Sequence, residues 1–142
     1  MALQAKEIYV NLPVKDLNKS VEFFTKLGFD FHPDMTDENA TCMIVGENMF
    51  VMLLTETFFQ TFTKKQLTDA TKNTETIIAL SADSRQGVND IVNKAFEAGG
   101  KASNDPMDDE YMYAWSFQDL DGHLWEVVAM PEQSDLDKSS AE

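Results

Sequence analysis

The sequence contains few residues of several types, and each scarcity excludes a class of protein. Among 142 residues there is one cysteine, Cys42, so an internal disulfide or a cysteine-rich zinc site is excluded. Lysine and arginine number only 11 against 25 aspartates and glutamates, which gives a formal net charge of -14. This negative charge disfavours nucleic acid and anionic membrane surfaces as partners.

Long apolar runs are also missing, and the first residues lack a basic stretch followed by an apolar one. We therefore expect no membrane span and no secretory signal. Together with the single cysteine, this favours a cytoplasmic location. Apolar residues nevertheless make up 43% of the chain and charged residues 25%, the balance of an ordinary globular protein. A chain of this length predicts one domain, residues 1–142.

The first half of the sequence predicts a β-α-β-β-β module over about residues 7–55. Residues 7–14 alternate in the manner of a strand. A helix with an apolar stripe follows, with Asp16 or Asn18 as its N-cap and Gly28 just past its end. Further extended segments are expected at residues 29–31, 40–45 and 49–54.

The second half repeats the same order over about residues 75–130, which indicates internal duplication. A strand at 76–82 precedes a helix that Ser84 caps and Gly99 ends. Residues 104–110 are expected to form a solvated acidic loop. Further extended segments are expected at residues 101–103, 111–117 and 123–130. The fold class is therefore α+β, built from two tandem modules, each with a small curved sheet and one helix.

Two segments lie outside the modules. Residues 57–70 carry apolar side chains, including Phe58, Phe62 and Leu67, that predict a connecting helix. Such a helix packs on the sheet or on a second copy of the chain; the alternative is a lid over a pocket. The tail, residues 131–142, has one apolar residue and is expected to be mobile.

Two runs of residues carry a resemblance to a known family. VNLPVKDLNKSVEFFTKLGFDF and FQDLDGHLWEVV resemble the vicinal oxygen chelate superfamily, which contains glyoxalases, bleomycin-resistance proteins and extradiol dioxygenases. The resemblance covers about residues 7–130. The segments LPVKDL, MLLTETFF and ALSADSR are similar to those of a bacterial group labelled predicted lactoylglutathione lyase. The resemblance implies two modules whose curved mixed sheets surround a cup.

In lactoylglutathione lyase this cup holds a divalent metal between two histidines and two glutamates. The matching positions here are Tyr9, Leu53, Ile77 and Glu126, so one of the four ligands is retained. Zinc, nickel or iron needs three or four nitrogen, sulfur or oxygen donors, and leucine and isoleucine offer none. We therefore expect no metal and no other cofactor at this site.

Strand alternation extends the candidate site beyond the family positions. Glu126 and Tyr9 are the candidate catalytic residues, as general base and acid, or as polar anchors for a ligand. Glu126 is expected to share the cup with Tyr9 and to accept hydrogen bonds there. The remaining candidates are predicted to bind ligand: Asn11, Leu53, Ile77, Ser81, Leu124 and Trp115.

The other reactive side chains are predicted to be structural. His123 lies three residues before Glu126 and faces the other side of its strand. His32, beside Pro33, is expected to be a surface histidine in a loop. Cys42 is expected to be a small packed hydrophobe, with no histidine placed to activate it.

Three classes of function remain open from the sequence. We favour metal-free binding of a small hydrophobic or aromatic molecule. Three of the four ligand positions lack a metal donor, but the fold that the resemblance implies still provides a cavity. The second class is an enzyme, either a lactoylglutathione-lyase-like isomerase or lyase, or a metal-free enzyme that uses Glu126 as base. The third is a domain whose dimer surface is the function. In each case we expect a homodimer, because curved sheets leave exposed edges.

Overall fold

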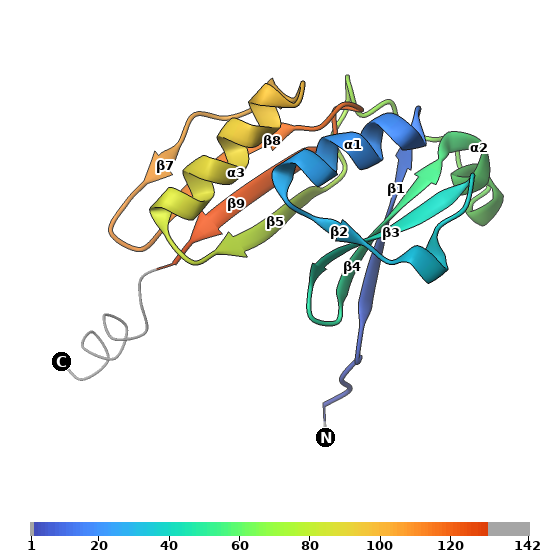
Figure 1. Ribbon diagram of the computed structural model, residues 1–142, viewed down its shortest axis with the longest axis horizontal. Coiled ribbons are helices and arrows are strands. Elements are labelled where there is room, and N and C mark those ends of the chain that lie inside the picture. Colours follow the sequence, from blue (N-terminus) through green and yellow to red (C-terminus); the bar gives the residue numbers. More distant parts are fainter. Residues whose placement is uncertain (1, 131–142) are drawn as a thin grey trace. The chain divides into compact units, whose positions relative to one another are not determined.

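The computed structural model describes residues 2–130, so the tail predicted to be mobile lies outside the described residues. The chain divides into two compact units, Met1–Asn73 and Thr74–Glu142. Each unit contains a mixed β-sheet and one long helix (Figure 1). The predicted α+β class and the β-α-β-β-β order of the first half are confirmed.

Unit 1, the segment Met1–Asn73, has a four-stranded sheet in the order β1-β4-β3-β2. Its strands are β1 (Ile8–Val14), β2 (Asp30–Phe31), β3 (Ala40–Gly46) and β4 (Met49–Thr55). β1 runs parallel to β4, whereas β4 with β3 and β3 with β2 are antiparallel. A short 3-10 turn, η1 (Pro33–Met35), lies between β2 and β3.

The helix of unit 1, α1 (Leu17–Leu27), begins and ends at signals that the sequence contains. The Asp16 carboxylate accepts a hydrogen bond from the Lys19 N–H at 3.1 Å and so acts as the N-cap. Gly28 has a φ of 112°, a left-handed conformation in which glycine avoids the strain of a side chain. The helix packs against β4 through one apolar face, which includes Phe23 and Phe24, each 1% exposed.

Unit 2, the segment Thr74–Glu142, has the sheet order β5-β9-β8-β6, with β7 also paired to β8. Its strands are β5 (Ile77–Ala82), β6 (Lys101–Ala102), β7 (Met107–Asp108), β8 (Tyr113–Gln118) and β9 (Leu124–Ala129). β7 was not expected, because its two residues lie inside the acidic segment predicted to be a loop. Asp108 forms an ion pair with Arg85 of the helix, so the segment is tied to the unit.

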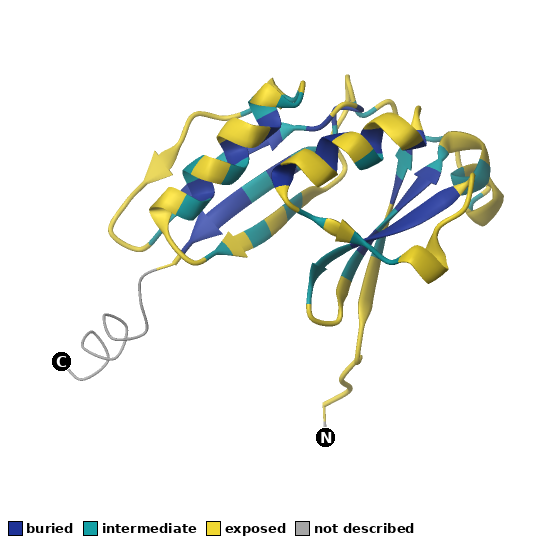
Figure 2. Cartoon of the chain, in the orientation of Figure 1, coloured by how far each residue is buried: buried dark blue, intermediate teal, exposed yellow. Residues whose placement is uncertain are grey.

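The helix of unit 2, α3 (Arg85–Glu97), follows the predicted cap, since the Ser84 hydroxyl accepts from the Gly87 N–H at 3.0 Å. Val88, Val92 and Ala95 are each 0% exposed and lie on the face that contacts β8 and β9. Figure 2 shows this division along α3, and shows β9 mostly buried beside a β5 that is exposed or half-buried.

The turn between β8 and β9 is built around a buried carboxylate, Asp119, which is 4% exposed. Its Oδ1 accepts from the backbone N–H groups of Asp121 at 2.9 Å and His123 at 3.0 Å. Its Oδ2 accepts from the indole N–H of Trp125 at 2.9 Å. This single side chain therefore fixes both the turn and the first part of β9.

The connecting helix expected over residues 57–70 is much shorter. The structure has α2 (Glu56–Phe59) and the 3-10 turn η2 (Gln60–Phe62), after which Thr63 is extended with a φ of -147°. The Gln60 side-chain amide donates to the carbonyls of Thr63 and Lys65, each at 2.9 Å, and holds the chain in a turn. These contacts replace the next turn of helix.

No helix in the described part of the chain is long and apolar enough to cross a membrane.

Candidate functional site

Each sheet has one face against its helix and one face without it. In unit 1 the helix-side face includes Leu12 and Val14, which are 6% and 1% exposed. We call the other side the open face of unit 1; it carries Tyr9, Asn11, His32, Cys42, Ile44, Phe50 and Met52. The predicted alternation of β1, with Leu12 and Val14 opposite Tyr9 and Asn11, is thus confirmed.

An aromatic pair dominates the open face of unit 1. The rings of Tyr9 and Phe50 stack with centroids 5.0 Å apart and an interplanar angle of 18°. Tyr9 remains 40% exposed, and its hydroxyl donates to the Glu7 carboxylate at 3.2 Å. The pair therefore offers an accessible ring surface with a polar group at its edge.

The environment keeps the Tyr9 phenol protonated. Loss of hydration is the main cause that raises the pKa of Tyr9 above its ordinary value, and the Glu7 hydrogen bond and negative charge raise it further. A raised pKa disfavours the phenolate, which is the form that ligates metals. It favours Tyr9 as a neutral hydrogen-bond donor.

Two other residues predicted for this site, Asn11 and Leu53, lie on opposite faces of the sheet. Asn11 is exposed on the open face, where its amide donates to the Tyr9 carbonyl at 3.4 Å. Leu53, in contrast, is 0% exposed and lies on the helix side of the sheet, because it is three residues from Phe50 on the same strand. The motif match located Leu53 in the sequence, but the strand register removes it from the face of Tyr9. Met52 occupies the neighbouring position on the open face.

The face of the unit 2 sheet that lies away from α3, which we call the open face of unit 2, contains the candidate general base, Glu126. Glu126 is half-buried, between Ala79 of β5 and Ser116 of β8 in the strand register. Within residues 2–130 its carboxylate has no hydrogen-bond or ion-pair partner. The other predicted residues on this face are Ile77 and Ser81, both exposed, and Leu124, half-buried. Unit 2 thus places three of the predicted ligand-binding residues on the same face as the Glu126 carboxylate.

Trp115 was predicted to bind ligand, and the structure places it on the other face. It pairs with Val127 and packs edge-on against Phe96 of α3, with ring centroids 5.5 Å apart. Ser116, the next residue, faces the same side as Glu126. Trp115 therefore belongs to the helix-side core of unit 2. The composition of the segment suggested an aromatic pocket, but the parity of β8 was fixed only by its register.

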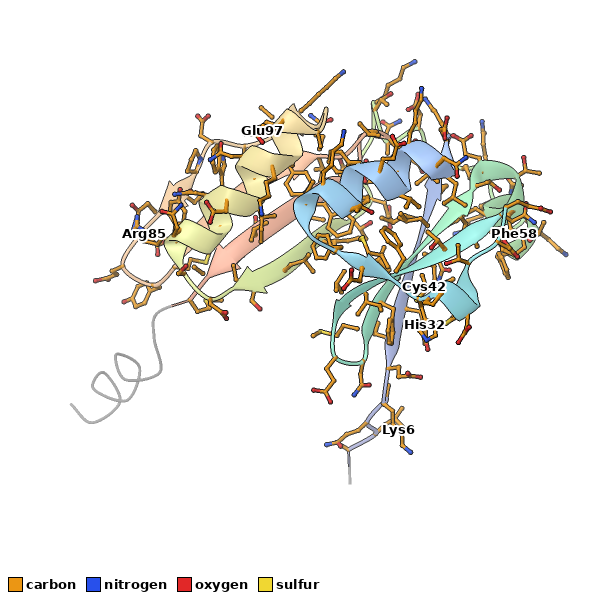
Figure 3. The ribbon with its side chains drawn as sticks, viewed as in Figure 1. Lys6, His32, Cys42, Phe58, Arg85 and Glu97 are labelled. Carbon is orange, nitrogen blue, oxygen red and sulfur yellow. The ribbon has the colours of Figure 1, made fainter. Side chains whose placement is uncertain are left out.

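A pair that sequence reasoning missed lies on the open face of unit 1. His32 lies between β2 and η1, outside the strands as predicted, but it is half-buried rather than a surface residue, and its N–H donates to the Cys42 carbonyl at 2.9 Å. The two side chains are therefore cross-strand neighbours, labelled together in Figure 3. Burial, followed by the negative charge of Glu7, raises the pKa of the Cys42 thiol. β2 has only two residues, too few to reveal this pairing in the sequence.

The donors do not fit the divalent metal of the family. In the described chain, no group of three or more histidine, cysteine, aspartate or glutamate residues is placed to hold a metal ion. The four family positions offer a phenol, two hydrocarbon side chains and the Glu126 carboxylate. Zinc, nickel, iron or manganese requires more nitrogen and oxygen donors than these positions supply.

Comparison with known proteins places this architecture in a family. A model described as bleomycin resistance protein-like N-terminal matches residues 7–46. A hypothetical protein from S. aureus is 31% identical, with a TM-score of 0.75, over 89% of this chain and 95% of that one. No match was found among curated proteins.

Two further solved structures share the fold at lower identity. A glyoxalase-related enzyme from Fulvimarina pelagi is 18% identical, with a TM-score of 0.74, over 91% of this chain and 90% of that one. A fosfomycin resistance protein from Listeria monocytogenes, complexed with Mn(II) and sulfate, is 16% identical, with a TM-score of 0.68, over 96% and 99%. With its duplicated β-α-β-β-β plan, the chain belongs to the vicinal oxygen chelate superfamily, the superfamily of glyoxalases and bleomycin-resistance proteins.

Proposed function

We propose that this protein binds a small hydrophobic or aromatic molecule on the open face of unit 2, without a divalent metal, and that Glu126 anchors the ligand. The observation that supports the proposal is that the Glu126 carboxylate is unpaired on a partly apolar face. It is half-buried, has no hydrogen-bond partner among the described residues, and lies beside Leu124 and Ile77. A ligand that covers this carboxylate removes its water, which is unfavourable unless the ligand supplies a hydrogen-bond donor in its place.

A ligand with an N–H or O–H group supplies such a donor. Its apolar part would cover Ile77, which is 58% exposed, and the half-buried Leu124. In small-molecule sites, apolar side chains usually supply most of the contact area and a few polar groups fix the orientation of the ligand. Ser81, on the same side of β5, offers a second polar contact.

Unit 1 offers a separate surface to which an aromatic molecule could bind. The stacked rings of Tyr9 and Phe50 present an accessible surface on which a flat molecule can stack. The neutral Tyr9 hydroxyl and the Asn11 amide are the polar groups beside it. The contribution of this face is tested separately from that of Glu126.

An enzyme is the second candidate, and one observation favours it. Glu126, which has no competing partner in residues 2–130, would be the base. A lactoylglutathione-lyase-like isomerase or lyase is a further form of this candidate, supported by resemblance alone.

The test is a thermal-shift screen of small aromatic and hydrophobic molecules in buffer containing a metal chelator. A hit is then compared between wild type, Glu126→Leu and Glu97→Leu. Glu97, exposed at the end of α3, provides the same substitution away from the open face. The proposal predicts that the ligand-induced shift persists in Glu97→Leu and is lost in Glu126→Leu. Equal shifts in all three folded proteins would make Glu126 a structural remnant.

A further inference from the structure

We propose that His32, Cys42 and Met52 form a binding site for one monovalent copper ion, Cu(I), on the open face of unit 1. The three side chains come from three successive chain segments: the residue that follows β2, the middle of β3 and the middle of β4. The site is separate from the four family metal positions, and the proposal does not depend on the proposed ligand-binding function.

The sheet register brings these three residues into one row. His32 pairs with Cys42 through the 2.9 Å backbone hydrogen bond, and Cys42 is directly opposite Met52. Residues that are directly opposite in antiparallel strands have Cβ atoms about 4.5–5.5 Å apart and side chains on the same face. Cys42 therefore lies between an imidazole on one side and a thioether on the other.

The three residues differ in exposure: the thiol at the centre of the row is buried, and the two side chains that flank it are partly exposed. Cys42 is 0% exposed, whereas His32 and Met52 are both half-buried and reach solvent. A metal ion can enter by moving the two flexible outer side chains, without opening the sheet. Methionine is suited to this because its unbranched side chain adapts to its surroundings.

The His32 ring carries an unsatisfied group. Its Nδ1 atom is buried without a hydrogen-bond partner, the one such side-chain nitrogen or oxygen found in residues 2–130. A buried polar atom left without a partner costs about 1–3 kcal/mol, so each case calls for an explanation. A metal ion beside the ring would use this nitrogen as a ligand.

The donor types select the ion. Thiolate and thioether sulfur prefer soft ions, and Cu(I) accepts sulfur together with imidazole nitrogen at low coordination number. Harder divalent ions prefer carboxylates and water, and this row contains neither a carboxylate nor an amide among its three donors. The row therefore favours Cu(I) over the divalent ions that the family binds.

Binding must release a proton. The Cys42 thiol loses its proton as the copper–sulfur bond forms, copper stays in the +1 state, and no electron is transferred. Burial and Glu7 keep this thiol protonated, and the groups that face it are His32, Tyr9 and Glu7. Affinity should therefore rise about tenfold per pH unit while the free thiol stays protonated.

The test is an anaerobic Cu(I) titration in competition with bicinchoninate, from pH 7 to 8. The variants are Cys42→Ser, Met52→Leu and His32→Gln. Met49→Leu, on the same strand as Met52 and 48% exposed, and His123→Gln are matched controls. We expect one Cu(I) per wild-type chain, loss of binding in Cys42→Ser, and weakening of about tenfold or more in Met52→Leu and His32→Gln.

The controls are expected to bind like wild type. Because Cys42→Ser alters a fully buried position, the comparison of Met52→Leu with Met49→Leu decides the question if that variant does not fold. Wild type binding no more tightly than folded Cys42→Ser would overturn the proposal. Equal weakening by Met49→Leu and Met52→Leu, or affinity independent of pH, would also overturn it.

Discussion

Replacing Asp119 with alanine is predicted to destabilise the protein strongly, although the residue is far in sequence from the helices. Three donors lose their acceptor: the N–H groups of Asp121 and His123, and the indole N–H of Trp125. Each buried donor left unpaired costs about 1–3 kcal/mol. Because the variant also removes a desolvated carboxylate, we take the lower end, about 3 kcal/mol in total. For a domain of this size that corresponds to a decrease in Tm of about 10 °C.

The assay is urea unfolding followed by tryptophan fluorescence, with thermal unfolding as a second measurement. Asp119→Asn should be intermediate, because an amide oxygen can still accept from the two turn N–H groups but its NH2 cannot accept from the Trp125 indole. Asp105→Ala, at an exposed aspartate, is the control and should cost less than about 0.5 kcal/mol. If Asp119→Ala loses no more stability than the control, the reasoning about this turn is refuted.

The pH dependence of the same variant has a defined sign. Burial raises the pKa of Asp119 above its ordinary value of 3.8, although His123 and the Trp125 hydrogen bond act in the opposite direction. A carboxyl whose pKa is higher in the folded state stabilises most below its unfolded pKa, and this stabilisation is lost as pH rises through the folded pKa. The difference in unfolding free energy between wild type and Asp119→Asn should therefore decrease as pH rises from below 3.8. An increase over that range would contradict the assignment.

Three further predictions follow from the rest of the structure. Trp115→Ala should lower the free energy of unfolding in urea by about 2–4 kcal/mol, because the half-buried ring packs on Phe96. The variant should leave the ligand-induced thermal shift unchanged; loss of that shift would mean that Trp115 contacts the ligand. Elemental analysis should find no stoichiometric zinc, nickel, iron or manganese, and one such ion per chain that is lost in Glu126→Gln would contradict this. Light scattering should show a homodimer, since the edge strands β1 and β5 expose Ile8 and Ile77 at 57% and 58%; a 16.0 kDa species alone would contradict it.

The sequence contained most of the fold because its signals are local. Asp16, Gly28 and Ser84 start or end helices through contacts within a few residues, and all three act as predicted. The connecting helix failed for the opposite reason. An apolar stripe predicted its length, but the side chain of Gln60 ended it through contacts that no periodicity reveals.

The candidate site could be predicted only where alternation along one strand was enough. Tyr9 and Asn11 share a face, as do Leu124 and Glu126, because each pair lies two residues apart. Leu53 was assigned by matching a motif, and the register of β4 with β1 places it on the helix side. Trp115 and the His32–Cys42 pair likewise depend on the register between strands, which the sequence does not specify.

We have proposed that Glu126 anchors a ligand without the help of a metal. The most direct test of this proposal is isothermal titration of a ligand from the thermal-shift screen into wild type and Glu126→Leu, each measured with and without EDTA. Losing a hydrogen bond to a charged group should weaken binding about 10- to 100-fold in Glu126→Leu, because such bonds contribute about 1.5–3 kcal/mol. We predict this loss, and wild-type affinity that EDTA does not change. Equal affinities of the two proteins, or wild-type binding that EDTA abolishes, would contradict the account.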